Sequence, residues 1–166
     1  MKIELKNIKY AEFASHETSC YEATIYIDGK KVGTVDNDGQ GGTDNVQPWS
    51  VAQQIDAYAA TLPKIACSWI DSATGKPAEM AHNHETIFGE LLTDWLHAKD
   101  LKRAMAKRIL FTGADGKIRE TVSLKADQLQ LQLARNNLRE ALKATDILNL
   151  MPFDQALKTY KQGATA

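Results

Sequence analysis

The sequence predicts an α+β fold in which an antiparallel sheet, built from two β-hairpins and an N-terminal strand, is covered by about five helices. Apolar and polar residues alternate around Asp28-Gly29, and a second pair of strand-like segments, 108–112 and 117–124, frames a turn at 113–116. Elsewhere, apolar residues recur at three- and four-residue intervals, which predicts helices. The strands do not alternate regularly with crossover helices, so a parallel Rossmann-like sheet is not expected.

The composition is typical of one folded domain, and we expect a single α+β domain over residues 1–166. Hydrophobic residues make up 43% of the chain, and the formal net charge of −1 predicts no global attraction to nucleic acid or membranes. No apolar run is long enough to span a membrane, and residues 1–10 do not resemble a signal peptide. We therefore expect a soluble, cytoplasmic protein that does not bind membranes.

The N-terminal part is predicted to contain three antiparallel strands. Residues 3–8 form the first strand, which we expect to pair with 21–27, and a tight turn then leads to a less regular strand at 32–36. The chain continues into a glycine-rich loop, residues 37–47. Three glycines within four positions of this loop allow sharp bends or the close approach of another group.

Helical periodicity predicts a first helix at 48–61 and a second helix that begins near Asn83. Lys102 would fall in the middle of the apolar face of the second helix if that helix ran on unbroken. We therefore expect a break at 98–100 and a separate short helix at 101–107.

The remaining segments are less regular. Residues 65–70 are mostly apolar, which fits a short strand or an extended piece of chain. A helix at 126–143 is expected to bend at 135–137, because its apolar stripes do not coincide. A last helix begins at Pro152, and residues 163–166 are expected to fray.

The glycine-rich loop is the first candidate site. It has neither the Gly-Lys-Ser/Thr ending of a Walker loop nor a Gly-x-Gly-x-x-Gly motif, and Asp36, Asp38 and Asp44 would repel an anion. These carboxylates do not have the spacing of a helix–loop–helix calcium site, so no cofactor is expected. A mobile connector is the favoured interpretation, and a partner-binding loop or a small-ligand site are the alternatives. The partner-binding candidates are Gly39, Gly41, Gly42, Thr43, Asp44, Asn45 and Trp49.

The segment at 82–85 is the second candidate site, because His82 and His84 could bind zinc together with Glu85. At the start of a helix, however, side chains two positions apart diverge. Only His97 or Asp94 would be available as a further ligand. Helix capping and solvation are the favoured interpretation, and no metal is expected.

The cysteines and two of the tryptophans are also chemical candidates. Cys20 and Cys67 could each be a nucleophile, but neither belongs to a recognisable motif, so we expect them to be small core residues. Trp49 and Trp69 could anchor a partner, although core packing is the favoured interpretation.

Basic residues gather between positions 99 and 108, where they could meet the phosphates of a nucleic acid. Asp100 interrupts the group, and no aromatic residues are interleaved for base stacking. A solvated helix face is the favoured interpretation, and nucleic-acid binding is the alternative. The residues concerned are Lys99, Lys102, Arg103, Lys107 and Arg108.

Two passages resemble small uncharacterised proteins of phages and other mobile elements of bacteria. The first is IDGKKVGTVDNDGQGGTDNVQP at 27–48, and the second is RILFTGADGKI at 108–118, followed downstream by ILNLMPFDQALKTY at 147–160. The resemblance implies a bacterial or phage cytoplasmic origin and a role against or alongside host machinery. It implies no activity and no catalytic residues.

These observations favour a non-enzymatic interaction protein, in the form of a phage or mobile-element modulator that binds a host protein complex. The expectation rests on a long polar loop in a chain without a recognisable catalytic constellation. One alternative is an enzyme or binder of a small ligand, nucleotide or metal that uses the loop, with Asp44 and His84 as its polar groups. Another is nucleic-acid binding through residues 99–108. The sequence leaves the oligomeric state open.

Overall fold

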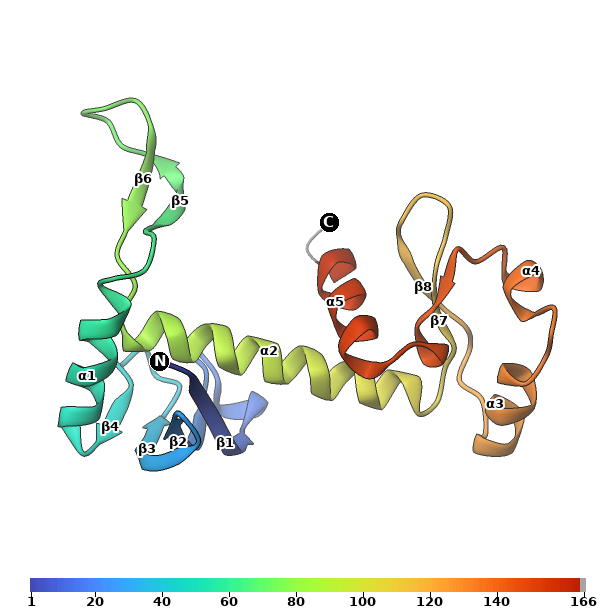
Figure 1. Cartoon of the computed structure of the whole chain (residues 1–166), viewed down its shortest axis with the longest axis horizontal. Helices are drawn as coiled ribbons and strands as arrows, with labels where there is room; N and C mark the ends of the chain where they lie inside the picture. Colours follow the sequence, from blue (N-terminus) through green and yellow to red (C-terminus); the bar gives the residue numbers. More distant parts are fainter. Residues whose placement is uncertain (165–166) are drawn as a thin grey trace. The chain divides into compact units, whose positions relative to one another are not determined.

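The structure is a computed structural model that describes residues 1–164 (Figure 1). Within this described part, five α-helices and three antiparallel sheets are present, which confirms the predicted α+β class. The contacts divide the chain into two compact units, unit 1 (Met1–Leu92) and unit 2 (Thr93–Ala166). That the chain folds as one domain stays a prediction, because two groups of contacts can still unfold in one transition.

Unit 1 contains a four-stranded antiparallel sheet of order β1-β2-β3-β4. The predicted pairing of the N-terminal strand with β2 is confirmed, and Asp28 and Gly29 have φ angles of 49° and 80°, as a tight primed turn requires. Strand β4 lies inside the predicted loop 37–47, where Val46 is buried and pairs with Val35. The strands are β1 Ile3–Tyr10, β2 Tyr21–Ile27, β3 Lys30–Asn37 and β4 Asn45–Gln47.

The core of unit 1 combines one face of this sheet with two helices. Alternate residues of β2 are buried, as the period-2 pattern predicts. Helix α1 (Trp49–Ala59) and the first turns of α2 (His84–Met105) add further buried apolar side chains, among them Ile55 and Phe88, which are both fully buried. Burial of such a side chain contributes about 2 kcal/mol.

Two further strands of unit 1 lie outside this core. Strands β5 (Ile65–Ile70) and β6 (Pro77–Met80) pair with each other in a two-stranded hairpin, which extends away from α1 and the four-stranded sheet (Figure 1). The strand interpretation of 65–70 is thus confirmed, whereas β6 was not expected. Residues 61–83 are all described, and none of them is buried.

Helix α2 runs unbroken through the region in which a break was expected, so the predicted break at 98–100 and the separate short helix after it are wrong. The core position next to Lys102 is taken by Leu101, which is fully buried, while Lys102 is exposed. The Lys102 Nζ lies 4.9 Å from the centroid of the Phe153 ring. A lysine stem that lies along an aromatic ring lets the helix continue without burying a charge.

Unit 2 is built on a three-stranded antiparallel sheet of order β8-β7-β9. The predicted second hairpin is confirmed as β7 and β8, but it forms its own sheet with β9. Phe111 packs into one hydrophobic cluster and Leu110 into another, so both faces of β7 are covered within unit 2. The elements are β7 Leu110–Thr112, β8 Ile118–Glu120, α3 Ala126–Leu133, α4 Leu138–Leu142, β9 Asp146–Ile147, the 3-10 turn η2 Leu148–Leu150 and α5 Phe153–Ala164.

The C-terminal helices differ from prediction in one respect. The bend expected at 135–137 is a complete break between α3 and α4. The last helix follows Pro152 as predicted, and residues 163 and 164 are its final two residues. The rest of the segment that was expected to fray, residues 165–166, lies outside the described residues.

Candidate functional site

The glycine-rich loop is organised around the side chain of Asn37. Its Oδ1 atom accepts hydrogen bonds from the Gly39 amide at 2.9 Å and from the Thr18 hydroxyl at 2.8 Å. Its Nδ2 group donates to the Gly42 carbonyl and to Asp44 Oδ1, both at 3.0 Å. These four bonds use the full hydrogen-bonding capacity of a buried amide. The loop is therefore attached to the end of β3 at several points.

The backbone of Gly39 forms a second attachment. Its carbonyl oxygen accepts hydrogen bonds from the amides of His16, Glu17 and Thr18, at 3.1, 3.0 and 3.4 Å. Gly39 has a φ angle of +83°, and a Cβ atom there would lie 2.2 Å from the carbonyl oxygen of Ala14. Only glycine fits this position, and Gly39 is buried in the contact rather than available to a partner.

The segment before β2 presents an aromatic side chain to solvent. A 3-10 turn, η1 (Glu12–Ala14), is closed by the Ala14 amide, which donates to the Ala11 carbonyl at 3.1 Å, and the Ala11 amide donates to the Cys20 carbonyl at 3.0 Å. The Ser15 hydroxyl donates to the Ala11 carbonyl at 2.9 Å. On this turn Phe13 is 88% exposed. A turn with its own hydrogen bonds thus holds one large apolar side chain outside the core.

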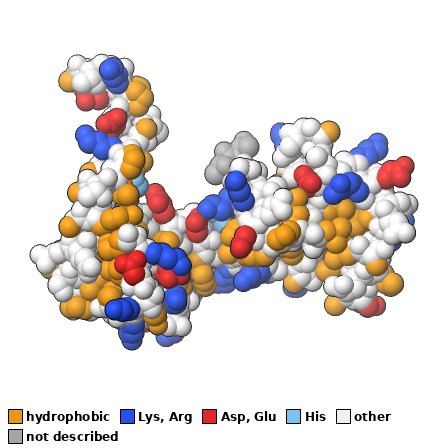
Figure 2. All heavy atoms as spheres, viewed as in Figure 1, with side chains coloured by type: hydrophobic (Ala, Val, Ile, Leu, Met, Phe, Trp, Pro, Cys, Tyr) orange, Lys and Arg blue, Asp and Glu red, His pale blue; other side chains and the backbone are white. Residues whose placement is uncertain are grey.

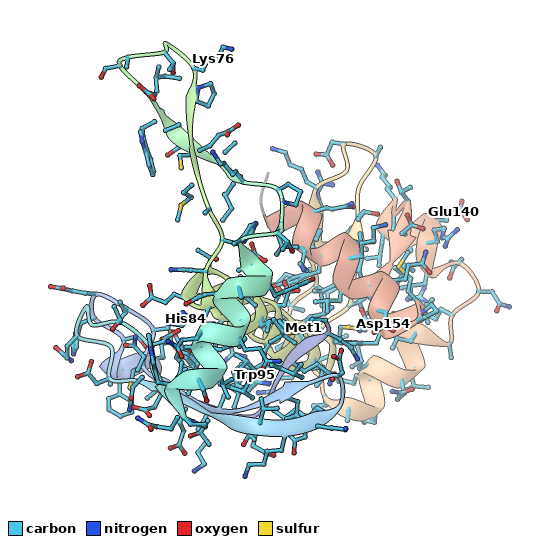
Figure 3. The ribbon with its side chains drawn as sticks, turned by 60° about the vertical axis from the view of Figure 1, so that its left-hand side comes forward. Met1, Lys76, His84, Trp95, Glu140 and Asp154 are labelled. Atoms are coloured by element: carbon cyan, nitrogen blue, oxygen red, sulfur yellow. The ribbon has the colours of Figure 1, made fainter. Side chains whose placement is uncertain are left out.

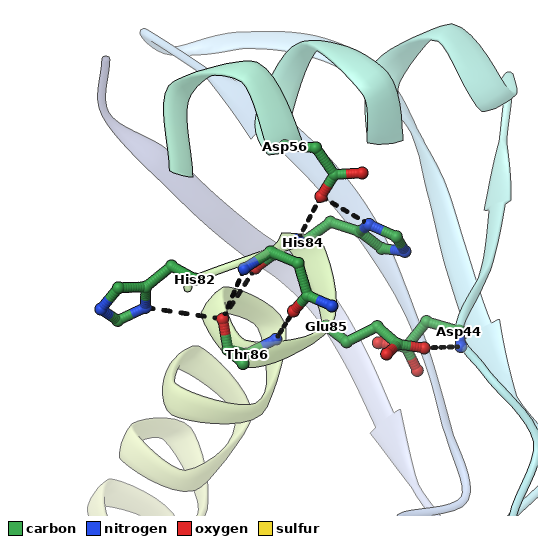
Figure 4. Close-up of polar contacts among 7 residues, drawn as sticks. Asp44, Asp56, His82, His84, Glu85 and Thr86 are labelled. Atoms are coloured by element: carbon green, nitrogen blue, oxygen red, sulfur yellow. Dashed lines mark hydrogen bonds and ion pairs between the residues drawn. The ribbon is translucent and has the colours of Figure 1, made fainter. Parts of the chain in front are cut away.

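At the other end of the loop, Asp44 is partly buried beside the start of α2. Its Oδ2 atom accepts a hydrogen bond from the Tyr21 hydroxyl at 2.8 Å. Its amide donates to Glu85 Oε1 at 3.2 Å (Figure 4). Burial raises the pKa of the Asp44 carboxyl, and Glu85 adds to this effect, while hydrogen bonds from Tyr21 and Asn37 oppose it. Burial, followed by the neighbouring Asp44, raises the pKa of the Tyr21 phenol well above its usual range.

His84 connects α1 with the start of α2. Asp56 Oδ1 lies 2.8 Å from His84 Nδ1 and accepts a hydrogen bond from the His84 amide at 2.7 Å (Figure 4). The Trp49 and His84 rings meet edge to face, with centroids 5.6 Å apart. Trp49 is nevertheless 54% exposed, so its expected core packing is wrong. As the first residue of α1, it contacts the His84 ring while much of its side chain stays exposed.

His82 and His84 do not come together as metal ligands. His82 Nδ1 lies 3.5 Å from the Thr86 hydroxyl, whereas His84 contacts Asp56, so the two rings have different neighbours (Figure 4). Asn83 between them caps α2, because its Oδ1 accepts a hydrogen bond from the Thr86 amide at 2.9 Å. Among the residues that the structure describes, no group of three or more His, Cys, Asp or Glu side chains could hold a metal ion.

The two arginines of the predicted nucleic-acid site pair with carboxylates. Arg103 lies 3.1 Å from Asp100, and Arg108 lies 2.6 Å from Glu120. A groove of unit 2 is lined by all four of these side chains. The carboxylates reduce the positive potential that phosphate binding requires.

The lysines of that site differ in their surroundings. The Nζ atoms of Lys99 and Lys102 each lie 4.9 Å from an aromatic ring centroid, that of Trp95 and that of Phe153 respectively. Lys107 lines the same groove as the arginines. The region is therefore a mixed-charge surface, and nucleic-acid binding there stays a prediction.

The cysteines and Trp69 are placed differently from the core positions expected for them. Cys20 and Cys67 are free thiols, and both are partly exposed. Cys67 lies on the β5–β6 hairpin, where no residue from 61 to 83 is buried, so a core role is wrong for it. Trp69 on the same hairpin is 60% exposed. The apolar composition of β5 suggested a core strand, but the hairpin has no core to enter.

Phe13 and Asp56 are candidates that sequence reasoning missed. Phe13 stands alone in a polar segment, without the periodicity that marks a strand or a helix face. Asp56 lies on the exposed side of a predicted helix and becomes a candidate only when the fold brings it to His84. No local signal could have found either of them.

Comparisons of the chain with family models, curated proteins and solved structures give no match. No helix within residues 1–164 has the length and hydropathy that crossing a bilayer requires.

Proposed function

We propose that the chain is a binding protein that recognises another protein through its η1–loop surface, which comprises residues 12–17 and 38–43. The observation that carries this proposal is Phe13, which is 88% exposed on a hydrogen-bonded turn. A large aromatic side chain on a rigid support loses little conformational freedom on binding, which suits it to fill a pocket on a partner.

The loop supports this surface with accessible backbone. Gly41 and Gly42 are exposed and carry no side chain, so a partner seated on Phe13 can approach their peptide groups closely. Of the predicted partner-binding residues, Gly39 is buried and Asp44 is partly buried. The exposed members are Gly41, Gly42, Thr43, Asn45 and Trp49.

The charges of the η1–loop surface define the kind of partner. Glu12, Glu17 and Asp38 are exposed there, whereas no lysine or arginine occurs at residues 10–29 or 32–63. Such a surface repels nucleic acid. It attracts a protein that presents an apolar pocket bordered by lysine or arginine, and this attraction speeds association at low salt.

A finer form of the proposal concerns the source of the partner. The resemblance of residues 27–48, 108–118 and 147–160 to proteins of phages and mobile elements supports a partner in a protein complex of a bacterial host. The protein would then modulate that complex by occupying a surface on it. A bacterial lysate is accordingly the place to look for the partner.

The test compares tagged wild-type protein with Phe13→Ser in capture from nuclease-treated bacterial lysate. The wild type is expected to capture one protein in stoichiometric amount, and Phe13→Ser at least about tenfold less, because truncation of an anchor residue weakens binding by that much or more. Phe13→Trp should retain capture, since another large aromatic can fill an apolar pocket.

The matched control is Leu131→Ser, which removes a single apolar side chain, 69% exposed, from α3 of unit 2. This variant should capture the partner as the wild type does. Capture that Phe13→Ser leaves unchanged, or that both serine variants lose equally, would contradict the proposal.

A second candidate function, ligand binding or catalysis with Asp44 and His84, has one observation in its favour. The Asp56 carboxylate holds the His84 ring through Nδ1 at 2.8 Å, an arrangement that leaves Nε2 for proton transfer or ligand contact. Asp44 is nearby, because its amide bonds to Glu85. Melting temperatures measured with divalent ions and nucleotides test this candidate, and a ligand that raises the value would support it.

A further inference from the structure

The β5–β6 hairpin exposes large apolar side chains. Trp69, Ile70 and Met80 are 60%, 59% and 40% exposed, and hydrophobic side chains are visible along the hairpin in Figure 2. In Figure 3 the hairpin extends to its tip at Lys76 without another element of unit 1 against it. An isolated two-stranded hairpin is only marginally stable in water, and exposed apolar groups favour a state in which they are covered. The hairpin is therefore a candidate docking surface.

The outer edge of β5 lacks the features that normally prevent strand pairing. Its six residues, Ile-Ala-Cys-Ser-Trp-Ile, include no charge, proline or glycine. Strand β6 begins with Pro77 and contains Glu79. The edge strand β1 carries Lys6 and Lys9 with a register shift between them, and the edge strand β8 carries Arg119. Charges and prolines protect exposed edges from pairing, so β5 is the less protected edge of the hairpin.

An irregular pairing with β6 leaves backbone groups of β5 without a cross-strand match. Ala66 pairs with Glu79 and Ile70 with Pro77, so three residues of β5 face one residue of β6. The extra residues of a bulge have no partner across the strand, and proline has no N–H to donate. The peptide groups on the outer edge of β5, which point away from β6, can be satisfied by a further strand.

We propose that two copies of this chain associate through β5, with the two β5 strands antiparallel and related by a two-fold axis. Lys64 directly precedes the strand and Asp71 directly follows it. Antiparallel pairing brings Lys64 of one copy to the end of the strand at which Asp71 of the other copy lies, and the contact recurs at the opposite end. Parallel pairing would bring lysine to lysine and aspartate to aspartate. Lys64 also lies 3.8 Å from Glu79 of its own hairpin, but its side chain is 63% exposed, so the end charges still favour a second copy in antiparallel orientation as the occupant.

This arrangement has a chemical consequence at Cys67. A two-fold antiparallel pair centres on one residue that lies opposite its own copy, and the midpoint between Lys64 and Asp71 leaves Cys67 or Ser68 as that residue. Centring on Cys67 places Trp69 opposite Ile65 of the other copy, whereas centring on Ser68 would place Asp71 opposite Ile65, so the register is centred on Cys67. The two copies of Cys67 are then directly opposed, about 5 Å apart, which is within the range that a disulfide can bridge. The same pairing covers the exposed side chains of Trp69 and Ile70.

Sedimentation velocity of the full chain over a wide concentration series tests the association. The wild type should form a dimer, and the double variant Trp69→Ser/Ile70→Ser should dimerise at least about tenfold more weakly, with an unchanged circular dichroism spectrum. Phe13→Ser, which removes an exposed aromatic from η1, should dimerise as the wild type does. This control separates the dimer from the proposed partner surface, so either can fail without the other.

Mild oxidation with diamide tests the antiparallel register. Cys20→Ser should form a disulfide-linked dimer through Cys67 at low protein concentration, and the added changes Trp69→Ser/Ile70→Ser should slow its formation. Cys67→Ser, which retains Cys20, should remain uncrosslinked. The proposal is overturned by a monomer at every concentration, by a dimer that the double variant leaves unchanged, or by a dimer that Cys67 does not crosslink.

Discussion

The glycine-rich loop and the β5–β6 hairpin are both excursions from the core of unit 1, and they are ordered in opposite ways. The loop is held by polar groups, since Asn37 makes four hydrogen bonds and the Gly39 carbonyl accepts three. The hairpin has two paired strands but no buried residue between positions 61 and 83. The glycine-rich loop is thus the more firmly attached of the two segments, and the apolar β5–β6 hairpin is the less firmly attached. Satisfied hydrogen bonds, rather than composition, make this difference.

The largest effect that this comparison predicts is at Gly39. Gly39→Ala should lower the free energy of unfolding by about 3 kcal/mol, because a Cβ atom would meet the Ala14 carbonyl oxygen and because φ is +83°. Gly42→Ala is the matched control, since no atom lies within 4 Å of its Cβ position. Urea denaturation measures both. Equal small changes for the two variants would mean that the loop is not held by close packing.

Asn37 should give the next largest effect. Asn37→Ala should lower the free energy of unfolding by about 2 kcal/mol, because it removes four hydrogen bonds from a buried site and leaves their partners to find new ones. Asn45→Ala provides the comparison, because Asn45 is exposed and its bond to Asp36 lies at the surface. A change of less than about 0.5 kcal/mol is expected there. Similar losses for both variants would place the attachment of the loop elsewhere.

The pH dependence of the free energy of unfolding tests how the loop is held at Asp44. Burial raises its folded-state pKa above the ordinary value of 3.8, so its contribution to stability is full below that value and is lost as pH rises through the raised pKa. Asp44→Asn keeps an acceptor for Tyr21 but cannot ionise. The free energy of unfolding of Asp44→Asn, relative to that of the wild type, should therefore increase as pH rises from about 4. The increase should be less than about 1 kcal/mol, because Asp44 is partly exposed.

Asp115 in unit 2 is the control of opposite sign. The hydrogen bonds from Arg119 lower the pKa of its carboxyl, so its contribution is present above the ordinary pKa and is lost as pH falls through the lowered one. Asp115→Asn should therefore lose stability relative to the wild type as pH rises toward about 4, just below the range in which Asp44 acts. If both variants shift in the same direction, burial is not what sets the titration of Asp44.

Elements with local signals could be predicted from the sequence. The alternation in β2, the Asp28-Gly29 turn and the Asn83 cap all depend on neighbouring residues, and the structure contains each of them. Strand β4 could not be predicted, because three residues show no period and Val46 is buried only through its pairing with β3. The unbroken course of α2 brings Lys102 beside the ring of Phe153, a contact between residues distant in sequence that the local pattern does not reveal.

The candidate site could be predicted only in part. The loop glycines were singled out because their sequence is unusual, but the sequence does not reveal that Gly39 is enclosed by Ala14 and Cys20. The pairing of Asp56 with His84 spans 28 positions and depends on how α1 packs beside the start of α2. Exposure was the hardest property to predict, since Trp69 looks like a core residue in any apolar segment.

The smallest expected effect concerns the hairpin and tests the comparison most directly. Trp69→Ser, measured in dilute solution where the chain is monomeric, should change the free energy of unfolding by less than about 0.5 kcal/mol, because its side chain is 60% exposed. Ile55→Ala in α1 should lose about 3 kcal/mol, because Ile55 is fully buried. A loss at Trp69 close to that at Ile55 would show that the hairpin packs on the core of unit 1. Its exposed side chains would then need no second copy to cover them, and the contrast with the loop would fail.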